Sequence, residues 1–142
     1  MFSKEESRLI RQEFWTSFGK SFPRKWILYN TKIKGLSFKF HFDTKSALIA
    51  LDLECDLENR IALWGKLLAL KSILKKEYLP DVIYEDTYFL ENGKEISRIY
   101  LPLEQKATIH NKNNWQDVMV FFNINMILFE AFFEEYNDFI SS

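Results

Sequence analysis

The chain has 142 residues, long enough for one domain with its own hydrophobic core, and its 19 Lys and Arg against 20 Asp and Glu give a net charge of -1. This balance excludes an overall positive field that would attract nucleic acid or an anionic membrane, while a local basic patch stays possible. The single cysteine, Cys55, excludes an internal disulfide, and "SKEESR" directly after Met1-Phe2 does not resemble a signal peptide. We therefore expect one cytoplasmic domain over residues 1–142.

The chain opens with a predicted amphipathic helix from about Ser3 to Phe18. Ser3 and Glu6 form a capping-box pattern, the apolar residues that follow are spaced four apart, and Gly19 favours an end to the helix. The segment "KWILYN" (25–30) then predicts a short strand after Pro23.

Two alternating segments predict a β-hairpin. "LSFKFHFD" (36–43) alternates between apolar and other residues, "ALIALDL" (47–53) reads as a second strand that ends with Asp52 and Glu54 on one face, and residues 43–46 have the composition of a turn. This turn sets Phe42 opposite Ala47, so that the apolar residues of both strands share one face. On the other face, Ser37 lies opposite Asp52.

The second half of the chain predicts two long helices and another hairpin. Asp56 can cap a helix over residues 57–78, in which Ile61, Trp64 and Leu68 form one apolar stripe beside a stripe of leucines. Asn92-Gly93 predicts a type I′ hairpin between "YEDTYFLE" and "KEISRIYL". Asn114 then caps a helix over residues 115–140, whose apolar run from 118 to 133 is too short for the roughly 20 residues of a membrane span.

The predicted order is α-β-β-β-α-β-β-α. It indicates an α+β fold in which three helices pack on a mixed, mainly antiparallel sheet of about five strands. Restriction-endonuclease-like domains have a similar order of elements.

Three stretches together resemble a known family: "SRLIRQEFWTSFGK" (7–20), "NGKEISRIY" (92–100) and "NWQDVMVFF" (114–122). They resemble an uncharacterised bacterial family, domain of unknown function 4268, over nearly the whole chain. The resemblance implies no catalytic residues, because none are known for the family.

Asp52 and Glu54 are the candidate acids of a metal site. They lie two residues apart on one face of a predicted strand. Metal-dependent nucleases of the PD-(D/E)xK type use acids from two adjacent strands to hold a divalent cation and a lysine to orient the attacking water. The lysine expected two residues after the second acid is absent, because Asp56 stands there. Lys39, diagonal to Asp52, could replace it, but an ordinary cross-strand ion pair explains Lys39 equally well.

Other sites have weaker support in the sequence. No glycine-rich phosphate loop, paired cysteines or helical HExxH spacing is present, and we expect no cofactor apart from the divalent metal of a nuclease. A local basic stretch with an aromatic residue is typical of nucleic-acid contacts, although lysines also simply solubilise loops. It comprises Arg24, Lys25, Trp26, Lys32 and Lys34.

The last predicted helix carries aromatic residues too widely spread for one stripe to bury them. Some of them, with Phe132, Tyr136 and Phe139 as candidates, are expected to contact another helix of the chain, a second copy or an unknown protein partner. The function favoured by the sequence is therefore a non-enzymatic interaction or accessory module without a membrane contact. The alternative is a divergent or degenerate nuclease-like domain that binds or cleaves nucleic acid.

Overall fold

The computed structural model describes residues 2–142. Within that range, β1 (Leu36–Phe42), β2 (Ala47–Leu53), β3 (Ile83–Phe89) and β4 (Glu95–Pro102) form an antiparallel sheet in the order β1-β2-β4-β3. The helices are α1 (Lys4–Ser21), α2 (Leu57–Ala69), α3 (Lys71–Glu77) and α4 (Trp115–Ser141), with a 3₁₀ turn, η1 (Lys112–Asn114), before α4. The α+β class is confirmed, but the predicted five strands, three helices and mixed sheet are corrected to four, four and antiparallel.

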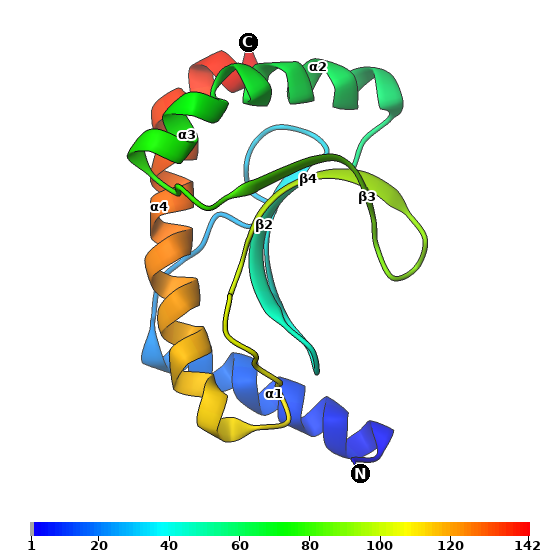
Figure 1. Cartoon of the computed structure of the whole chain (residues 1–142), viewed down its shortest axis with the longest axis vertical. Helices are drawn as coiled ribbons and strands as arrows, with labels where there is room; N and C mark the ends of the chain where they lie inside the picture. The colour runs from blue at the N-terminus through cyan, green and yellow to red at the C-terminus, as the bar shows by residue number, and fades with distance from the viewer. Residues whose placement is uncertain (1) are drawn as a thin grey trace.

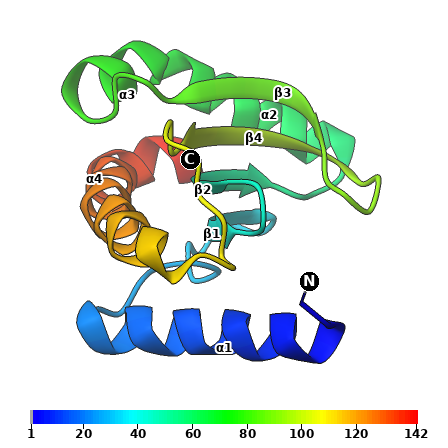
Figure 2. The same cartoon turned by 60° about the horizontal axis from the view of Figure 1, so that its bottom comes forward.

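The helices leave one face of the sheet uncovered. In Figure 1, α4 runs lengthwise beside the sheet, α1 crosses below it and α2 lies above it, and Figure 2 shows α4 nearly end-on against the strands. Phe38 of β1 contacts Phe129 and Phe133 of α4, with ring centroids 5.2 and 5.6 Å apart. On the opposite face the described residues form no helix, and the β3–β4 hairpin curls beside it (Figure 1).

Aromatic side chains fill the space between α1, α4 and the sheet. Phe14 of α1 is completely buried, and its ring lies 4.9 Å from Phe42 of β1 and 5.3 Å from Trp115 of α4. Edge-to-face geometry dominates these contacts, as the quadrupoles of the rings favour. The high aromatic content of the sequence is thus largely core.

The predicted hairpin register is confirmed at every pair. Phe42 lies opposite Ala47, Phe38 opposite Leu51 and Ser37 opposite Asp52. The alternating pattern determines this register because a shift of one residue would move the apolar side chains to the uncovered face.

The predicted strand at residues 25–30 is wrong. Leu28 has a left-handed φ of 47°, and the amide of Asn30 donates to the carbonyl of Ile27 at 2.8 Å, so the chain turns there. The amide of Ile27 donates to the buried Glu130 carboxylate at 2.7 Å. A contact with α4, distant in sequence, therefore overrides the local β-propensity.

Two predicted helices differ in extent from the observed ones. The capping box of Ser3 and Glu6 is confirmed, but α1 continues through Gly19 to Ser21. The predicted helix 57–78 divides at Leu70, whose φ of -97° and ψ of 1° separate α2 from α3. Leu70 is buried, and no Gly or Pro marks the break, which indicates that tertiary packing causes it.

Two predicted local motifs also require correction. The side chain of Asn114 does not cap α4, because it accepts a hydrogen bond from the amide of Thr108 at 3.1 Å. The second hairpin turns at the predicted Asn92-Gly93, but its loop is longer than type I′. Gly93 donates to the carbonyl of Leu90 at 2.8 Å with a left-handed φ of 86°, as in a three-residue loop with a glycine bulge.

Candidate functional site

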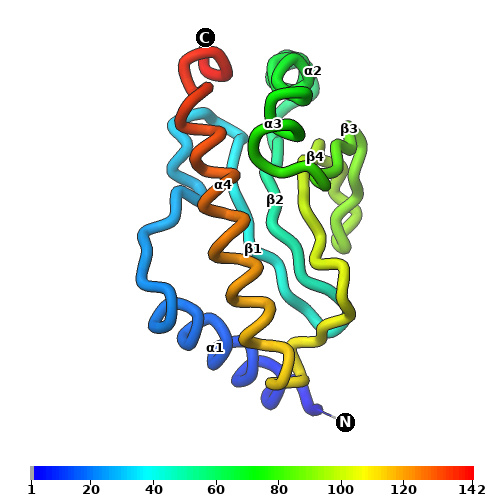
Figure 3. Tube along the Cα trace, turned by 60° about the vertical axis from the view of Figure 1, so that its left-hand side comes forward, coloured from blue at the N-terminus to red at the C-terminus, as the bar shows by residue number. Residues whose placement is uncertain are grey.

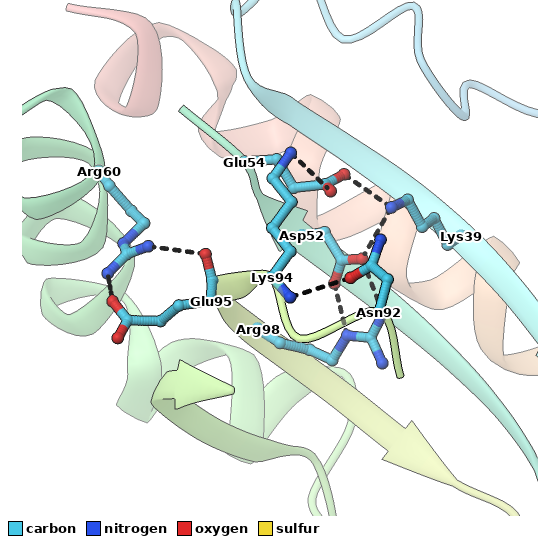
Figure 4. Close-up of polar contacts among 8 residues, drawn as sticks. All are labelled: Lys39, Asp52, Glu54, Arg60, Asn92, Lys94, Glu95 and Arg98. Atoms are coloured by element: carbon cyan, nitrogen blue, oxygen red, sulfur yellow. Dashed lines mark hydrogen bonds and ion pairs between the residues drawn. The ribbon is translucent and has the colours of Figure 1, made fainter. Parts of the chain in front are cut away.

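A charged cluster lies on the uncovered sheet face, where three strands bring it together (Figure 4). Asp52 of β2 is fully buried and lies opposite Arg98 of β4. The guanidinium of Arg98 donates from Nε and Nη2 to the two carboxylate oxygens, at 2.7 and 2.8 Å. This bidentate geometry is the strong form of a charge-assisted hydrogen bond.

Lysines neutralise the second acid of the cluster. The ammonium of Lys39 lies 2.7 Å from Glu54 and 3.3 Å from Asp52, and Lys94 lies 3.5 Å from Glu54. Partial burial raises the pKa of Glu54, but Lys39 and Lys94 outweigh this effect and hold the pKa below its usual value. Burial likewise lowers the pKa of Lys39, yet its two carboxylate partners raise it above the usual value. All these charges are therefore compensated within the chain.

A tyrosine of β3, Tyr88, covers the guanidinium of Arg98. The guanidinium lies 4.5 Å from the centre of the Tyr88 ring, and Tyr88 in turn lies 5.5 Å from Tyr100. A pocket of about 500 Å³ remains between the hairpin tip and the β1–β2 turn, and His41 and Asp43 line it together with Arg98. His41 is bonded to Asp43, with Nε2 2.9 Å from Oδ2.

The acids of this cluster do not fit a metal ion. Each oxygen of Asp52 accepts a hydrogen bond from Arg98, and each oxygen of Glu54 faces a lysine. No group of three or more His, Cys, Asp or Glu side chains suited to a metal was found among residues 2–142. A cation bound here would have to displace positive charges that are already bonded to the same oxygens.

The structure thus brings together Lys39, Asp52 and Glu54, as the predicted cross-strand pair requires. It adds Arg98 and Lys94, which the sequence reasoning missed. The alternation in "EISRIY" places Arg98 on one face of a strand. Its pairing with Asp52 depends on the contact between β2 and β4, which no local pattern reveals.

The predicted basic stretch is divided between buried and exposed residues. Trp26 is half-buried and packs against Phe40, with ring centroids 5.3 Å apart, so its ring is part of the core. Arg24 lies over the Trp26 ring and 3.2 Å from Glu130. Lys25, Lys32 and Lys34 are exposed.

The three aromatic interface candidates on α4 also differ in exposure. Phe132 is fully buried and packs against Tyr78 of the same chain, which removes it as an interface residue. Tyr136 is half-buried beside Phe132, and Phe139 is 45% exposed. Residues 112–141 have the length and apolar composition of a membrane-crossing helix, a property that core helices share. The inner face of this segment is core.

An exposed apolar face on α2 was missed. Leu57 and Ile61 are 61% and 63% exposed, and Leu68 is 44% exposed. From Ile61 to Ala69, each exposed residue of α2 is apolar or glycine. The one charged side chain in this interval, Lys66, bends back to the carbonyl of Ile140 at 3.3 Å. The sequence indicated two apolar stripes. Leu67, Leu70 and Leu74 of one stripe are buried in the core, whereas in the other stripe Ile61 and Leu68 are exposed and Trp64 is half-buried against Tyr84.

Comparison with known families identifies the family of this chain. A family model described as Domain of unknown function (DUF4268) matches residues 10–137 of the 142. The chain belongs to this family. No curated protein and no solved structure matches it. Membership in the DUF4268 family confirms the resemblance found in the sequence and carries no assigned activity.

Proposed function

We propose that this chain is a protein-association module that pairs with a second copy of itself through α2. The observation that carries the proposal is the apolar face of α2, because an exposed stripe of large apolar side chains marks an interaction surface. Fully burying a Leu or Ile side chain stabilises an interface by roughly 1.5–3 kcal/mol. Leu57, Ile61 and Leu68 together offer several such contributions.

The spacing of this face favours a second copy as the partner. Positions 57, 61, 64 and 68 are four, three and four residues apart, so the stripe has the same spacing in both directions. A two-fold axis at its centre sets Leu57 against the partner's Leu68, and Ile61 against the partner's Trp64. Such a self-complementary patch is what a symmetric dimer requires.

Gly65 adds room for close approach. It lies on the exposed side of α2, and a Cβ atom added there would meet nothing within 4 Å. The 13 residues of α2 span only about 20 Å, so the interface is small and the dimer is expected to be weak and concentration-dependent.

The association can be tested by sedimentation velocity over a range of protein concentrations. We expect the wild type to shift from monomer to dimer, and the double variant Ile61→Glu/Leu68→Glu to stay monomeric with an unchanged circular dichroism spectrum. Leu9→Glu is the matched control, because Leu9 is 50% exposed on α1, away from this face. A wild type that stays monomeric at the highest concentration, or a double variant that still dimerises, would overturn the proposal.

The nuclease alternative depends on metal binding at Asp52 and Glu54. A specific ligand at a hundred times its dissociation constant adds about 2.7 kcal/mol to the stability of the folded state. Because both carboxylates are bonded to cationic side chains, we expect Mn²⁺ or Mg²⁺ to leave the melting temperature unchanged. Stabilisation that Asp52→Ala/Glu54→Ala abolishes would instead support the nuclease.

A further inference from the structure

A long stretch of the sequence contains no acidic residue. Between Glu13 and Asp43 there is no Asp or Glu, although acids and bases are nearly equal in number over the whole chain. The same stretch holds six basic residues: Lys20, Arg24, Lys25, Lys32, Lys34 and Lys39. Most of them lie in the loop between α1 and β1, residues 22–35.

Three lysines of this loop form no ion pair within the described part of the chain. Lys25, Lys32 and Lys34 are exposed, and none of the ion pairs between the described residues includes them. Asp56 is the nearby acid: Asn59 chiefly, and Lys34 to a smaller extent, lower its pKa. By contrast, Arg24 is bonded to Glu130 and Lys39 to Glu54.

An exposed aromatic residue lies between these lysines in the sequence. Tyr29 is 75% exposed, more than any other large apolar side chain in the described part of the chain. Among the described residues, no aromatic contact involves its ring. Unlike Trp26, Tyr29 can therefore stack on a ligand without leaving the core.

The loop holds these side chains on a fixed backbone. Phe38 of β1 donates to the carbonyl of Leu28 at 2.9 Å, and the buried hydroxyl of Thr31 donates to the carbonyl of Leu36 at 2.7 Å. Leu28 and Lys32 have left-handed φ angles of 47° and 67°, a strained arrangement that tertiary contacts maintain. A rigid loop loses little conformational entropy when it binds a ligand.

The loop runs beside α4 from the end of α1 to the start of β1 (Figure 3), with a turn at residues 27–30. Along it come Lys25, then Tyr29, then Lys32 and Lys34. Lysines along a path with an exposed aromatic ring between them are what a single-stranded nucleic acid needs, because the cations contact its phosphates and the ring stacks on a base. A duplex offers phosphates, but its bases are already stacked.

We infer that loop 22–35 binds single-stranded nucleic acid, with Tyr29 stacking on a base and Lys25, Lys32 and Lys34 contacting phosphates. The inference is independent of the proposed dimer. Three phosphate contacts give a slope of about -2 for log K against log salt, at roughly -0.7 per contact.

The test is fluorescence anisotropy of labelled 20-nucleotide oligo-dT and oligo-U at several salt concentrations, with a 20-base-pair duplex and heparin in parallel. We expect Tyr29→Ala to weaken single-strand binding about tenfold, the order of one base stack, and Tyr29→Phe to restore it. Phe89→Ala is the aromatic control, since Phe89 is 64% exposed on β3.

The contribution of the lysine charges is tested with the double variant Lys32→Gln/Lys34→Gln. We expect the magnitude of the salt slope to fall by about 1.4, whereas the control Lys76→Gln/Lys106→Gln, at two exposed lysines elsewhere, leaves it unchanged. No binding of either oligonucleotide would overturn the inference. Equal affinity of wild type and Tyr29→Ala for the oligonucleotides would also overturn it. So would a higher affinity for heparin than for single strands that Tyr29→Ala leaves unchanged, because both results indicate a generic polyanion contact.

Discussion

The uncovered sheet face and the outer face of α2 invert the usual distribution of side chains. On the sheet face, the charged Asp52 and Arg98 are 0% and 5% exposed although no helix covers them. On α2, the apolar Leu57 and Ile61 are more than half exposed. The difference lies in the available partners. Each buried charge meets an opposite charge at a neighbouring strand position, whereas no part of residues 2–142 covers Leu57 and Ile61.

The comparison separates charges that are paired within the chain from an apolar surface that another molecule would have to cover. A buried ion pair with all its oxygens bonded requires nothing from outside. An exposed apolar stripe is stabilised only by another surface. Substitutions on the sheet face should therefore change the stability of the monomer, and substitutions on α2 should change association.

The largest effect is expected at Asp52. Asp52→Asn leaves the buried guanidinium of Arg98 without its counter-charge, which costs about 3–5 kcal/mol in unfolding free energy. Urea denaturation followed by circular dichroism measures this loss. Asp81→Asn, at an exposed residue without an ion pair among those described, should change stability by less than about 0.5 kcal/mol.

The pair can be tested further by removing both charges. Asp52→Leu/Arg98→Met should be much less destabilising than Asp52→Asn, because no unpaired charge is left buried. If the double variant loses as much stability as Asp52→Leu and Arg98→Met lose when added together, the two charges are not coupled, which contradicts the interpretation of the sheet face.

On the α2 side, Gly65 and Gly19 form a matched pair. Both lie in helices with nothing within 4 Å of an added Cβ, so Lys at either position should stabilise the monomer by roughly 0.5–1 kcal/mol through helix propensity. Only Gly65→Lys places a charge on the proposed interface. We expect sedimentation to show loss of the dimer for Gly65→Lys and not for Gly19→Lys, and equal behaviour of the two would argue against an interface at α2.

The smallest effect is the pH dependence contributed by Glu54. Its pKa is below the usual 4.5 in the folded chain, so its ion pairs contribute stability above the pKa of the unfolded state, and this contribution is lost as the pH falls through the folded value. Urea midpoints measured from pH 6 down to pH 3 should fall less steeply for Glu54→Gln than for wild type. Identical slopes would show that Lys39 and Lys94 do not stabilise the ionised carboxylate.

The sequence predicted contacts between neighbouring segments better than contacts between segments that are distant in the chain. The β1–β2 register and the Lys39–Asp52 diagonal follow from alternation and one short turn, and both are observed. For α2, periodicity showed which residues share a stripe. It could not show that the stripe of Leu67 would be buried and that of Ile61 exposed, because both are apolar.

In the candidate sites, too, the contacts that the sequence did not predict are between distant segments. Arg98 was missed because it meets Asp52 only after β4 joins β2. The stacking candidate Trp26 packs against the core, where the hydrogen bond from Ile27 to Glu130 of α4 holds the loop. Tyr29 carries no local signal that distinguishes its exposed ring from the half-buried ring of Trp26.

The Asp52–Arg98 pair joins residues 46 positions apart, on two strands separated in sequence by α2, α3 and β3. A register error of one residue between β2 and β4 would turn Arg98 toward the aromatic core and leave Asp52 buried alone. The pair therefore penalises misaligned pairing of these two strands.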